Sequence, residues 1–179
     1  MLPSILIGLA VVVVLLVVIV AMQPAEFRIA RSATITAKPS AVFAVVNDFH
    51  NWEAWSPWAK IDPTMNSLYA GAPSGVGAIY SWIGNNKVGE GRMTLIESQP
   101  SDLIRIKLEF LKPFTATNTA EFTFKSEGTQ TVVEWSMTGT NKFMAKAFGL
   151  LMNMDKMCGG DFEKGLASLK SLVETAHLK

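Results

Sequence analysis

The sequence predicts an α+β protein in which a curved antiparallel sheet wraps one long C-terminal helix, with a separate membrane-spanning helix near the N-terminus. Three observations predict this arrangement. An unbroken apolar run occupies residues 5–22, alternating segments joined by short turns fill the middle, and an apolar stripe at helical spacing ends the chain. The 179 residues therefore divide into an anchor over residues 1–23 and one domain over residues 24–179.

The apolar run contains only apolar residues and glycine from Ile5 to Met22. At about 1.5 Å per residue it reaches roughly 27 Å, close to the ~30 Å hydrocarbon core of a bilayer. A helix is the one spanning conformation of a single segment that satisfies its own backbone in lipid, so the valine-rich run is predicted to be helical. A cleaved signal peptide is the alternative. Three features favour a retained anchor over a signal peptide. No Lys or Arg precedes the run, the run is longer than the apolar region of a usual signal peptide, and the residues at its end match a small-x-small cleavage site poorly.

The charges beside the run indicate an orientation. Arg28 and Arg31 follow it, whereas no charged side chain precedes it. The positive-inside rule then predicts a single-pass membrane protein whose domain lies on the cytoplasmic side. Because residues 23–26 leave almost no linker, the domain is expected to sit close to the lipid surface.

The domain begins with a strand and short helices. Residues 27–37 alternate as a strand does, and Lys38-Pro39-Ser40 ends the pattern. Ser40 or its neighbour is expected to cap a helix over residues 41–48. The aromatic stretch over residues 49–58 contains prolines and predicts short helical turns. Its three tryptophans are too many for the core of such a loop, so some are expected at a pocket mouth or the lipid interface.

Five further strands are predicted over residues 78–83, 91–97, 103–111, 116–124 and 131–138. Turns containing Gly, Asn or Pro join them, so an antiparallel meander is the economical topology. In the third of these, Ile104, Ile106, Leu108 and Phe110 share one face and charged residues the other. Asn118 falls on the same face as Ala120 and Phe122 and is predicted to point inward.

A helix is predicted over residues 143–177, with Phe162, Leu166, Leu169 and Val173 forming a stripe at 3.6-residue spacing. Gly159-Gly160 interrupts it. Two glycines cost about 2 kcal/mol relative to alanines, which indicates a kink or a close backbone contact. The methionines of the first half suit a gate over a cavity, a lipid contact or an irregular core. They are Met144, Met152, Met154 and Met157.

The order of strand, short helices, antiparallel strands and long helix is that of the helix-grip fold. Several segments also carry a family resemblance: residues 37–43, 48–49, 52–58, 75–77 and 161–166, with the Tyr80 and Trp82 pair. Over residues 27–175 the chain resembles the polyketide cyclase/dehydrase and lipid transport family, of the SRPBCC superfamily that includes START domains and the birch pollen allergen. The resemblance implies a sheet that wraps the long helix and leaves a cavity for an apolar or amphipathic ligand. Members include lipid carriers, ubiquinone-binding proteins and a few cyclases.

The expected cavity residues are inward aromatic side chains, one amide and one methionine near the start of the long helix. Plain core packing is the alternative for the aromatic residues. A buried Asn118 amide needs a partner, which is backbone, water or the polar head of a ligand. The predicted lining is Trp52, Trp55, Tyr80, Trp82, Phe110, Asn118, Phe122, Trp135 and Met154.

The residues predict no catalytic group, no cofactor and no metal site. His50, His177 and Cys158 lack metal-ligand spacing, and Cys158 is expected to be a small buried hydrophobe rather than a nucleophile. Glu90 and Arg92 share a strand face. They form either a buried pair able to move protons or, with Met93 and Leu95 inward, two solvated charges, and the second reading is favoured.

Charge and glycine patterns exclude other classes. A net charge of +1 from 16 basic and 15 acidic residues gives no electrostatic signature of nucleic-acid binding. The glycine clusters at residues 75–77 and 89–91 lack the Gly-Lys-Ser/Thr of a phosphate loop and are predicted to be hairpin turns.

The expected function is therefore a membrane-anchored, non-enzymatic binder of a lipophilic small molecule, lipid- or quinone-like, with the bilayer and that ligand as its partners. A cyclase- or dehydratase-like enzyme is one alternative, and it requires an inward acid, base or tyrosine. A regulatory interaction module for a membrane partner is the other. A filled interior with an exposed apolar patch would favour the module.

Overall fold

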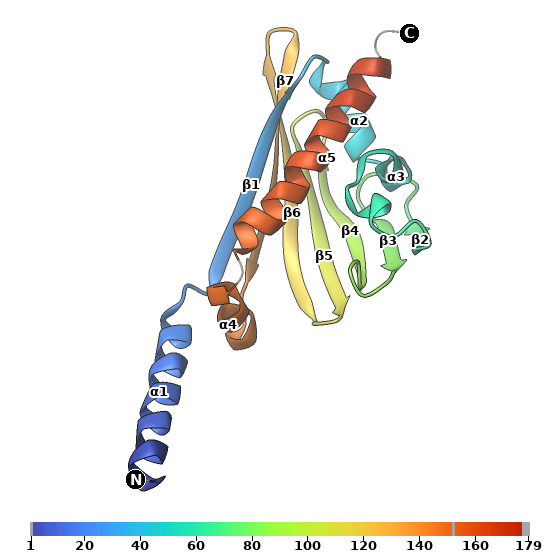
Figure 1. Cartoon of the computed structure of the whole chain (residues 1–179). Helices are drawn as coiled ribbons and strands as arrows, with labels where there is room; N and C mark the ends of the chain where they lie inside the picture. Colours follow the sequence, from blue (N-terminus) through green and yellow to red (C-terminus); the bar gives the residue numbers. More distant parts are fainter. Residues whose placement is uncertain (1, 152, 177–179) are drawn as a thin grey trace.

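A computed structural model of the chain describes residues 2–151 and 153–176, so Met152 and His177 lie outside the described residues. Helix α1 (Leu2–Met22) projects from one end of the rest of the molecule (Figure 1). From Ile5 to Met22 it is long and apolar enough to cross a membrane, and Val20 is its one buried side chain in that range.

The body of the molecule is a seven-stranded antiparallel sheet in the order β1-β7-β6-β5-β4-β3-β2. Each strand pairs with its chain neighbour except β1, which closes against β7. This confirms the predicted α+β helix-grip class. The strands are β1 (Glu26–Ile35), β2 (Asn66–Gly71), β3 (Ala78–Ile83), β4 (Glu90–Gln99), β5 (Leu103–Lys112), β6 (Ala116–Glu127) and β7 (Gln130–Thr140).

Strand β2 was not predicted from the sequence. It forms the far edge of the sheet and pairs with β3, and five of its six residues are exposed. An edge strand without a buried face shows no alternation of apolar and polar residues, so the periodicity on which the other strands were recognised is missing here.

Four short helices precede β2, and two helices follow β7. They are α2 (Pro39–Val46), η1 (Phe49–Asn51), α3 (Trp52–Trp55), η2 (Trp58–Lys60), α4 (Phe143–Leu151) and α5 (Met154–Ala176). The expected Ser40 cap is wrong. Lys38 occupies the N-cap without a side-chain hydrogen bond, and Pro39 opens α2 because its fixed φ suits the first helical turn.

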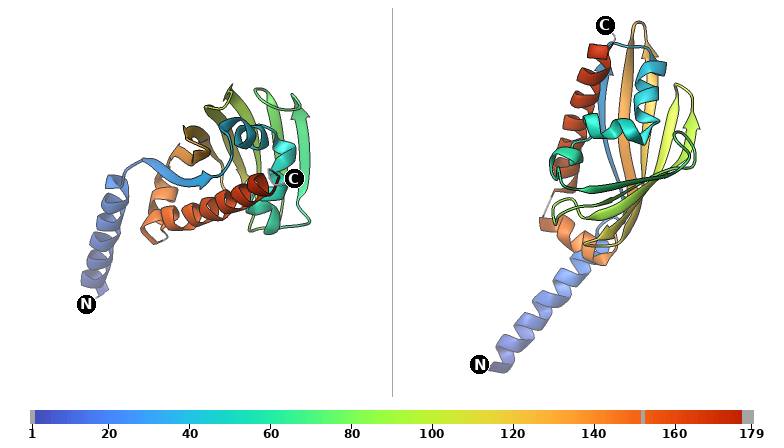
Figure 2. Two further views of the ribbon diagram at one scale, coloured as in Figure 1. Left: turned by 90° about the horizontal axis from the view of Figure 1, so that it is seen from above. Right: turned by 90° about the vertical axis from the view of Figure 1, so that its right-hand side faces the viewer.

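Helix α5 lies across the concave face of the sheet, beside β1 (Figures 1 and 2). Its stripe of Phe162, Leu166, Leu169 and Val173 is buried, as predicted. The helix runs unbroken through Gly159-Gly160, so of the two readings of that pair the close contact is correct and the kink is not.

The contact at Gly159 is with Arg31 of β1. A Cβ on Gly159 would lie 2.1 Å from the Arg31 Nη2 atom. The guanidinium is held there by Asp155 at 3.0 Å and Glu163 at 2.7 Å, and these two hydrogen bonds raise the Arg31 pKa. The absence of a side chain at Gly159 therefore leaves space for the Arg31 guanidinium, whose ion pairs with Asp155 and Glu163 join β1 to α5.

The three tryptophans of the aromatic stretch all join one core cluster, contrary to the expectation that some would leave it. Trp52 and Trp55 are buried, and Trp58 packs edge-to-face on Trp135 and Phe162. The short helices that carry them cover the half of the concave face away from α1 (Figure 1). Three indoles fit because α5 and the sheet enclose them from two sides.

A buried carboxylate, Asp62, fastens the loop after η2 to the β3–β4 turn. Its Oδ1 accepts hydrogen bonds from the Thr64 hydroxyl at 2.7 Å and the Thr64 N–H at 3.1 Å, and its Oδ2 accepts one from the Asn85 N–H at 2.7 Å. The bond from the Thr64 hydroxyl, followed by that from Asn85, holds the Asp62 pKa below its ordinary value of 3.8.

This lowered pKa predicts an acid sensitivity that depends on Asp62. A carboxyl whose pKa is lower in the folded state stabilises the fold above its unfolded pKa, and this contribution is lost as the pH falls through the folded pKa. Between about pH 5 and about pH 2, the urea midpoint of the Asp62→Asn variant should therefore fall less than that of the unmodified protein. Parallel midpoints over this range would contradict the prediction.

Candidate functional site

One row of side chains crosses the whole concave face near the end of the sheet next to α1. The strand register pairs its members directly, from β1 to β2. We call it the Asn118 row, after its central residue. Its members are Phe27, Gly139, Asn118, Leu108, Met93, Tyr80 and Tyr69.

The Asn118 row is less covered than the next inward row. The next row, made of Ile29, Met137, Ala120, Ile106 and Leu95, is buried throughout. In the Asn118 row only Asn118 and Met93 are buried, and the other side chains are partly exposed. Phe110, the following inward residue of β5, is also partly exposed. The concave face is thus sealed in its distal half and is less completely covered toward α1, although Trp82 on the row beyond is buried.

Asn118 is the polar centre of this otherwise apolar and aromatic region. Its side chain is 8% exposed, and its amide Nδ2 approaches the Met137 sulfur at 3.8 Å. Among the described residues this weak contact is its only side-chain hydrogen bond. The amide also fills the space above Gly139, where a Cβ would lie 2.2 Å from Asn118 Oδ1. Glycine on β7 therefore lets the amide lie flat on the sheet.

The distal half of the concave face is filled by aromatic rings. Trp135 stacks on Phe162 with centroids 4.2 Å apart and on Phe122 at 4.9 Å, while Trp55 meets Trp135 and Phe122 edge-to-face. The indole N–H groups of Trp55 and Trp135 are buried without a hydrogen-bond partner among the described residues. Trp52 instead donates to the Val46 carbonyl at 2.9 Å.

The structure separates the predicted lining residues into three groups. Trp52, Trp55, Phe122 and Trp135 belong to the filled distal core. Tyr80, Trp82, Phe110 and Asn118 lie on the half of the sheet nearer α1. There Trp82 contacts Tyr80 and Phe110, Trp82 and Asn118 are buried, and Tyr80 and Phe110 are partly exposed. Met154 is at the first turn of α5, 43% exposed, and lines a different hollow. Their role as ligand contacts remains a prediction.

Two hollows open at the surface. One, of about 350 Å³, lies between α2, α3 and the C-terminal end of α5, and Leu172 and Val173 contribute to its mostly apolar wall. The other, of about 500 Å³, lies where α1, α4 and α5 approach one another, and it is lined by Lys146, Met154 and the residues around them. Sequence reasoning identified neither, because both depend on how separate helices meet.

The titratable groups near the open end do not form an acid–base pair. Glu90 bonds to Lys112 at 2.6 Å and Arg92 to Glu109 at 3.4 Å, while Met93 and Leu95 point inward. The favoured reading of these two charges is therefore correct. Tyr80 lies on the Asn118 row, but its hydroxyl shares a hydrogen bond with Ser67 at 3.0 Å, and burial raises its pKa. A neutral phenol is a weak base.

The surroundings of Cys158 disfavour a reactive thiol, and the candidate metal ligands among the described residues are not brought together. Burial, followed by the nearby Asp161 and Asp155 charges, raises the pKa of the Cys158 thiol, which disfavours the nucleophilic thiolate. Within the described part of the chain, no three His, Cys, Asp or Glu side chains are grouped as metal ligands.

Replacing Asn118 by leucine should raise the free energy of unfolding by about 1–2 kcal/mol. A buried amide without a strong partner costs about 1–3 kcal/mol, and leucine has a similar shape without that cost. Chemical unfolding of the full chain in mild detergent measures the change, with Asn118→Asp as the control that should destabilise. A loss of stability in Asn118→Leu would mean that the amide is well satisfied.

Comparisons with known proteins agree with this architecture. Residues 26–174 match the family described as polyketide cyclase / dehydrase and lipid transport. No curated protein matches the sequence.

Among solved structures, protein CV1439 from Chromobacterium violaceum has a TM-score of 0.58 at 15% identity, covering 84% of this chain and 99% of that protein. The Aha1 dimer from Colwellia psychrerythraea has a TM-score of 0.59 at 14% identity, covering 83% and 96%.

The di-domain ARO/CYC StfQ from the steffimycin biosynthetic pathway has a TM-score of 0.62 at 12% identity, covering 87% of this chain and 53% of StfQ. At such identities these structures share the fold alone. The family match covers most of the chain, and the protein therefore belongs to the polyketide cyclase / dehydrase and lipid transport family.

Proposed function

We propose that this protein is a membrane-anchored, non-enzymatic binder of a lipophilic small molecule, lipid- or quinone-like. Residues 1–23 would anchor it, and the domain over residues 24–179 would hold the ligand on the open half of the concave face. One observation carries the proposal: the Asn118 row is apolar and only partly covered, with a single weakly bonded amide at its centre. An apolar wall with one polar group suits an amphipathic ligand.

The anchor supports the same ligand class. A lipophilic molecule partitions into the bilayer, and only the three residues 23–25 separate the end of α1 from β1. The open half of the concave face is the half nearer α1 (Figure 1). A ligand leaving the lipid would therefore reach this half first.

The cytoplasmic orientation is part of the proposal and depends on Arg28 and Arg31. In the folded domain Arg28 pairs with Glu134 and Arg31 with Asp155 and Glu163. The positive-inside rule acts during insertion, when these partners have not yet been brought together. A membrane-impermeant thiol reagent applied to intact cells carrying Leu68→Cys tests the side: labelling from outside would contradict it.

A single substitution tests where the ligand binds. Leu108→Trp should fill the open end of the concave face and abolish ligand binding, because the larger ring occupies the ligand's volume beside Asn118. Native mass spectrometry of the full-length protein, before and after exposure to labelled phospholipid and quinone, measures binding. Leu68→Trp adds the same bulk at an exposed position of edge strand β2 and should bind normally.

Two results would count against this proposal. An unmodified protein that is repeatedly empty and takes up neither probe would contradict ligand binding itself. Equal binding by Leu108→Trp and Leu68→Trp would place the ligand elsewhere. A circular-dichroism spectrum for each variant establishes that it is folded, so that lost binding is not lost structure.

A regulatory interaction module is the second candidate, and a specific observation favours it. The aromatic cluster fills the distal interior, and the apolar side chains of α4 are exposed. Co-purification of one stoichiometric membrane protein with an empty full-length chain would favour this function. The cyclase-like alternative has less support, because Tyr80 is bonded to Ser67 and its pKa is raised.

A further inference from the structure

An exposed apolar surface covers the end of the domain next to α1. We call it the base patch and define it as Phe143, Met144 and Phe148 of α4, Phe114 of the β5–β6 turn, and Met154 and Met157 of α5. Met144 is 64% exposed and Phe114 is 69% exposed. The Phe114 and Phe148 rings lie 6.1 Å apart, so two distant parts of the chain form one surface. Large apolar side chains clustered in this way mark an interaction surface.

One side of helix α4 faces the domain and the opposite side is exposed. Ala145, Lys146, Gly149 and Leu150 line the hollow that α4 shares with α1 and α5. Met144 and Phe148, four residues apart, occupy the opposite side of the helix and are exposed. Helix α4 therefore presents Met144 and Phe148 away from the domain, while Leu150 faces the hollow.

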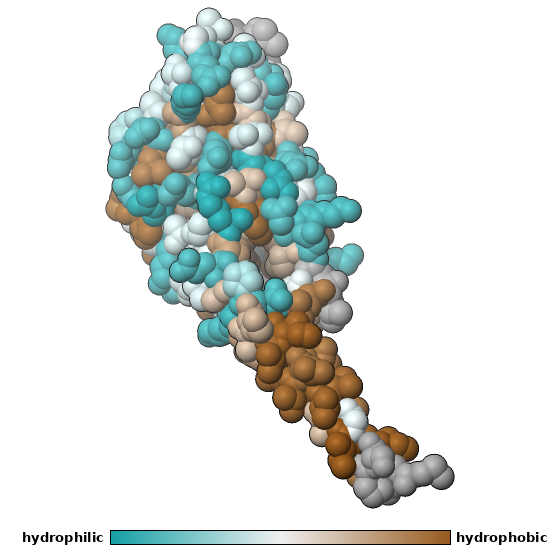
Figure 3. All heavy atoms as spheres, turned by 90° about the vertical axis from the view of Figure 1, so that its left-hand side faces the viewer, coloured by the Kyte–Doolittle hydropathy of each residue, from teal (hydrophilic) through white to brown (hydrophobic). Residues whose placement is uncertain are grey.

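The base patch is continuous with the end of α1. The Lys146 Nζ atom donates a hydrogen bond to the Ala21 carbonyl at 3.4 Å, and Val20 is buried where α1 meets α4. The Asn141 N–H bonds to the Ala25 carbonyl at 2.7 Å. Figures 1 and 2 place α4 and the β5–β6 turn at the level where α1 ends, and Figure 3 shows hydrophobic surface running from α1 to the adjoining base of the domain.

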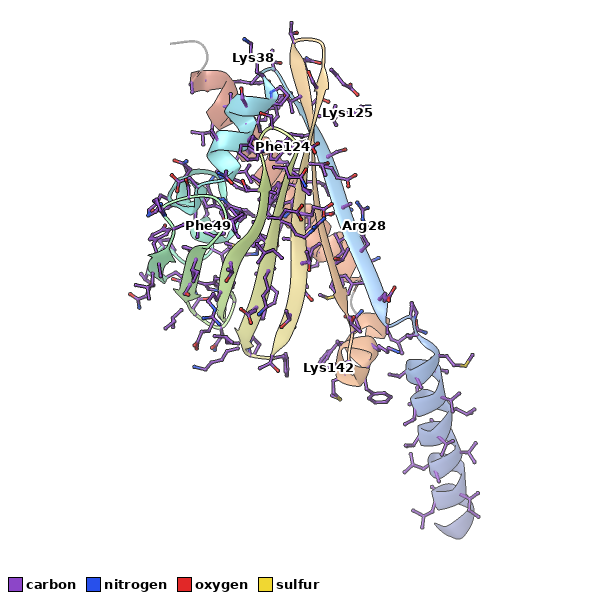
Figure 4. All side chains as sticks on the ribbon, turned by 180° about the vertical axis from the view of Figure 1, so that it is seen from behind. Arg28, Lys38, Phe49, Phe124, Lys125 and Lys142 are labelled. Atoms are coloured by element: carbon purple, nitrogen blue, oxygen red, sulfur yellow. The ribbon has the colours of Figure 1, made fainter. Side chains whose placement is uncertain are left out.

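Charged residues around the base patch suit a phospholipid surface. Lys142 precedes α4 and is exposed, and Lys112 ends β5 with its side chain 73% exposed while bonded to Glu90. Figure 4 shows Lys142 at α4, at the end of the domain next to α1, with Lys38 and Lys125 at the opposite end. A lysine beside an apolar surface can bury its methylene chain and keep its ammonium group at the phosphate level.

We propose that the base patch inserts into the headgroup–acyl boundary of the bilayer that α1 spans, with α4 lying in the membrane plane. This inference rests on the proposed anchoring by α1. With so short a connection between α1 and β1, a spanning α1 brings the base patch to the lipid surface. Helix α4 is far too short to cross a bilayer, so it lies along the interface. The domain is then fixed in orientation, with the open half of its concave face toward the lipid.

The test measures the depth of single spin labels on the full-length protein in vesicles of phosphatidylcholine and phosphatidylglycerol. In a Cys158→Ala background, a cysteine is introduced at Met144, Phe148 or Phe114 and labelled. Leu68→Cys is the matched control, because Leu68 is 66% exposed at the far edge of the sheet. Val13→Cys in α1 reports on the anchor itself.

We expect oxygen, which concentrates in lipid, to relax the Met144, Phe148 and Phe114 labels more strongly than a water-soluble nickel chelate does. Their depth should be about 5–10 Å below the headgroup level, as for interfacial helices. The Leu68 label should show the opposite order. Removing phosphatidylglycerol should leave the Val13 label in lipid and make the labels of the base patch shallower.

The remaining outcomes separate the inference from the anchoring on which it rests. If the Val13 label is in lipid but the base-patch labels respond like the Leu68 label, the inference is overturned and the anchoring stands. If the base-patch labels are shielded from both reagents, a protein surface covers them and the inference is also overturned. If the Val13 label is itself water-accessible, the anchoring fails and the inference falls with it.

Discussion

Replacing Gly165 by alanine is expected to lower the free energy of unfolding by about 1–3 kcal/mol. Gly165 is buried on α5 against the sheet, and a Cβ there would lie 2.8 Å from Trp135 Cζ3 and 3.1 Å from Pro57 Cδ. Both neighbours are rigid rings within a packed core, so neither can move without displacing others. The better helix propensity of alanine, worth about 1 kcal/mol, offsets only part of this cost.

The neighbouring glycine Gly160 provides the control with the opposite sign. It lies in the same helix, and a Cβ added there would have no atom within 4 Å outside its immediate surroundings. Gly160→Ala should therefore raise the free energy of unfolding by up to about 1 kcal/mol through helix propensity alone. Urea unfolding in mild detergent, followed by circular dichroism, measures both variants. Similar effects at the two positions would mean that α5 packs differently on Trp135.

Truncating Trp135 to alanine is expected to cost about 3–5 kcal/mol, the largest effect of a single substitution considered for this domain. Its ring is 2% exposed and is stacked between Phe162, at 4.2 Å and 7°, and Phe122, at 4.9 Å and 26°. Removing it leaves a cavity between the sheet and α5, which the surrounding rings can fill only in part.

A second substitution at the same position separates the effect of ring packing on stability from the effect of the buried indole N–H that lacks a partner among the described residues. Trp135→Phe retains a stacked ring and removes the buried donor, so it should cost much less, about 1–2 kcal/mol. Phe114→Ala, at a 69% exposed ring, should change stability by less than about 0.5 kcal/mol. A Trp135→Phe cost equal to that of Trp135→Ala would indicate that the N–H has a partner, such as a water or a ligand.

The faces of the central strands were predictable because the alternation has a period of two and only one face is buried. In β5, Ile104 and Ile106 are buried, and in β7, Val133, Trp135 and Met137 are buried, as the pattern indicated. The stripe of α5 was predictable for the same reason at a period of 3.6. A pattern that repeats locally needs no knowledge of the partner elements.

Features without a local pattern were missed. Strand β2 has no buried face. The Asp62 carboxylate accepts hydrogen bonds from Thr64 and from Asn85, and Asn85 lies in a turn that is distant from Asp62 in the sequence. Gly159 leaves space for the Arg31 side chain, which extends from β1 to Asp155 and Glu163. Arg31 could not be identified from the sequence as the contact of Gly159, because these residues are far apart along the chain. Phe114 entered no prediction, because a phenylalanine beside a proline turn has no periodicity to interpret.

The sequence by itself determined the apolar α1, the inward faces of the central strands, the buried stripe of α5 and the resemblance that the family match confirms. Only the tertiary structure decided which inward residues are sealed and which are open. Ile104 and Leu108 share one face of β5, but Ile104 is buried and Leu108, nearer the other end of the strand, is partly exposed. Coverage of this kind depends on register and helix placement between distant segments, which no local periodicity encodes.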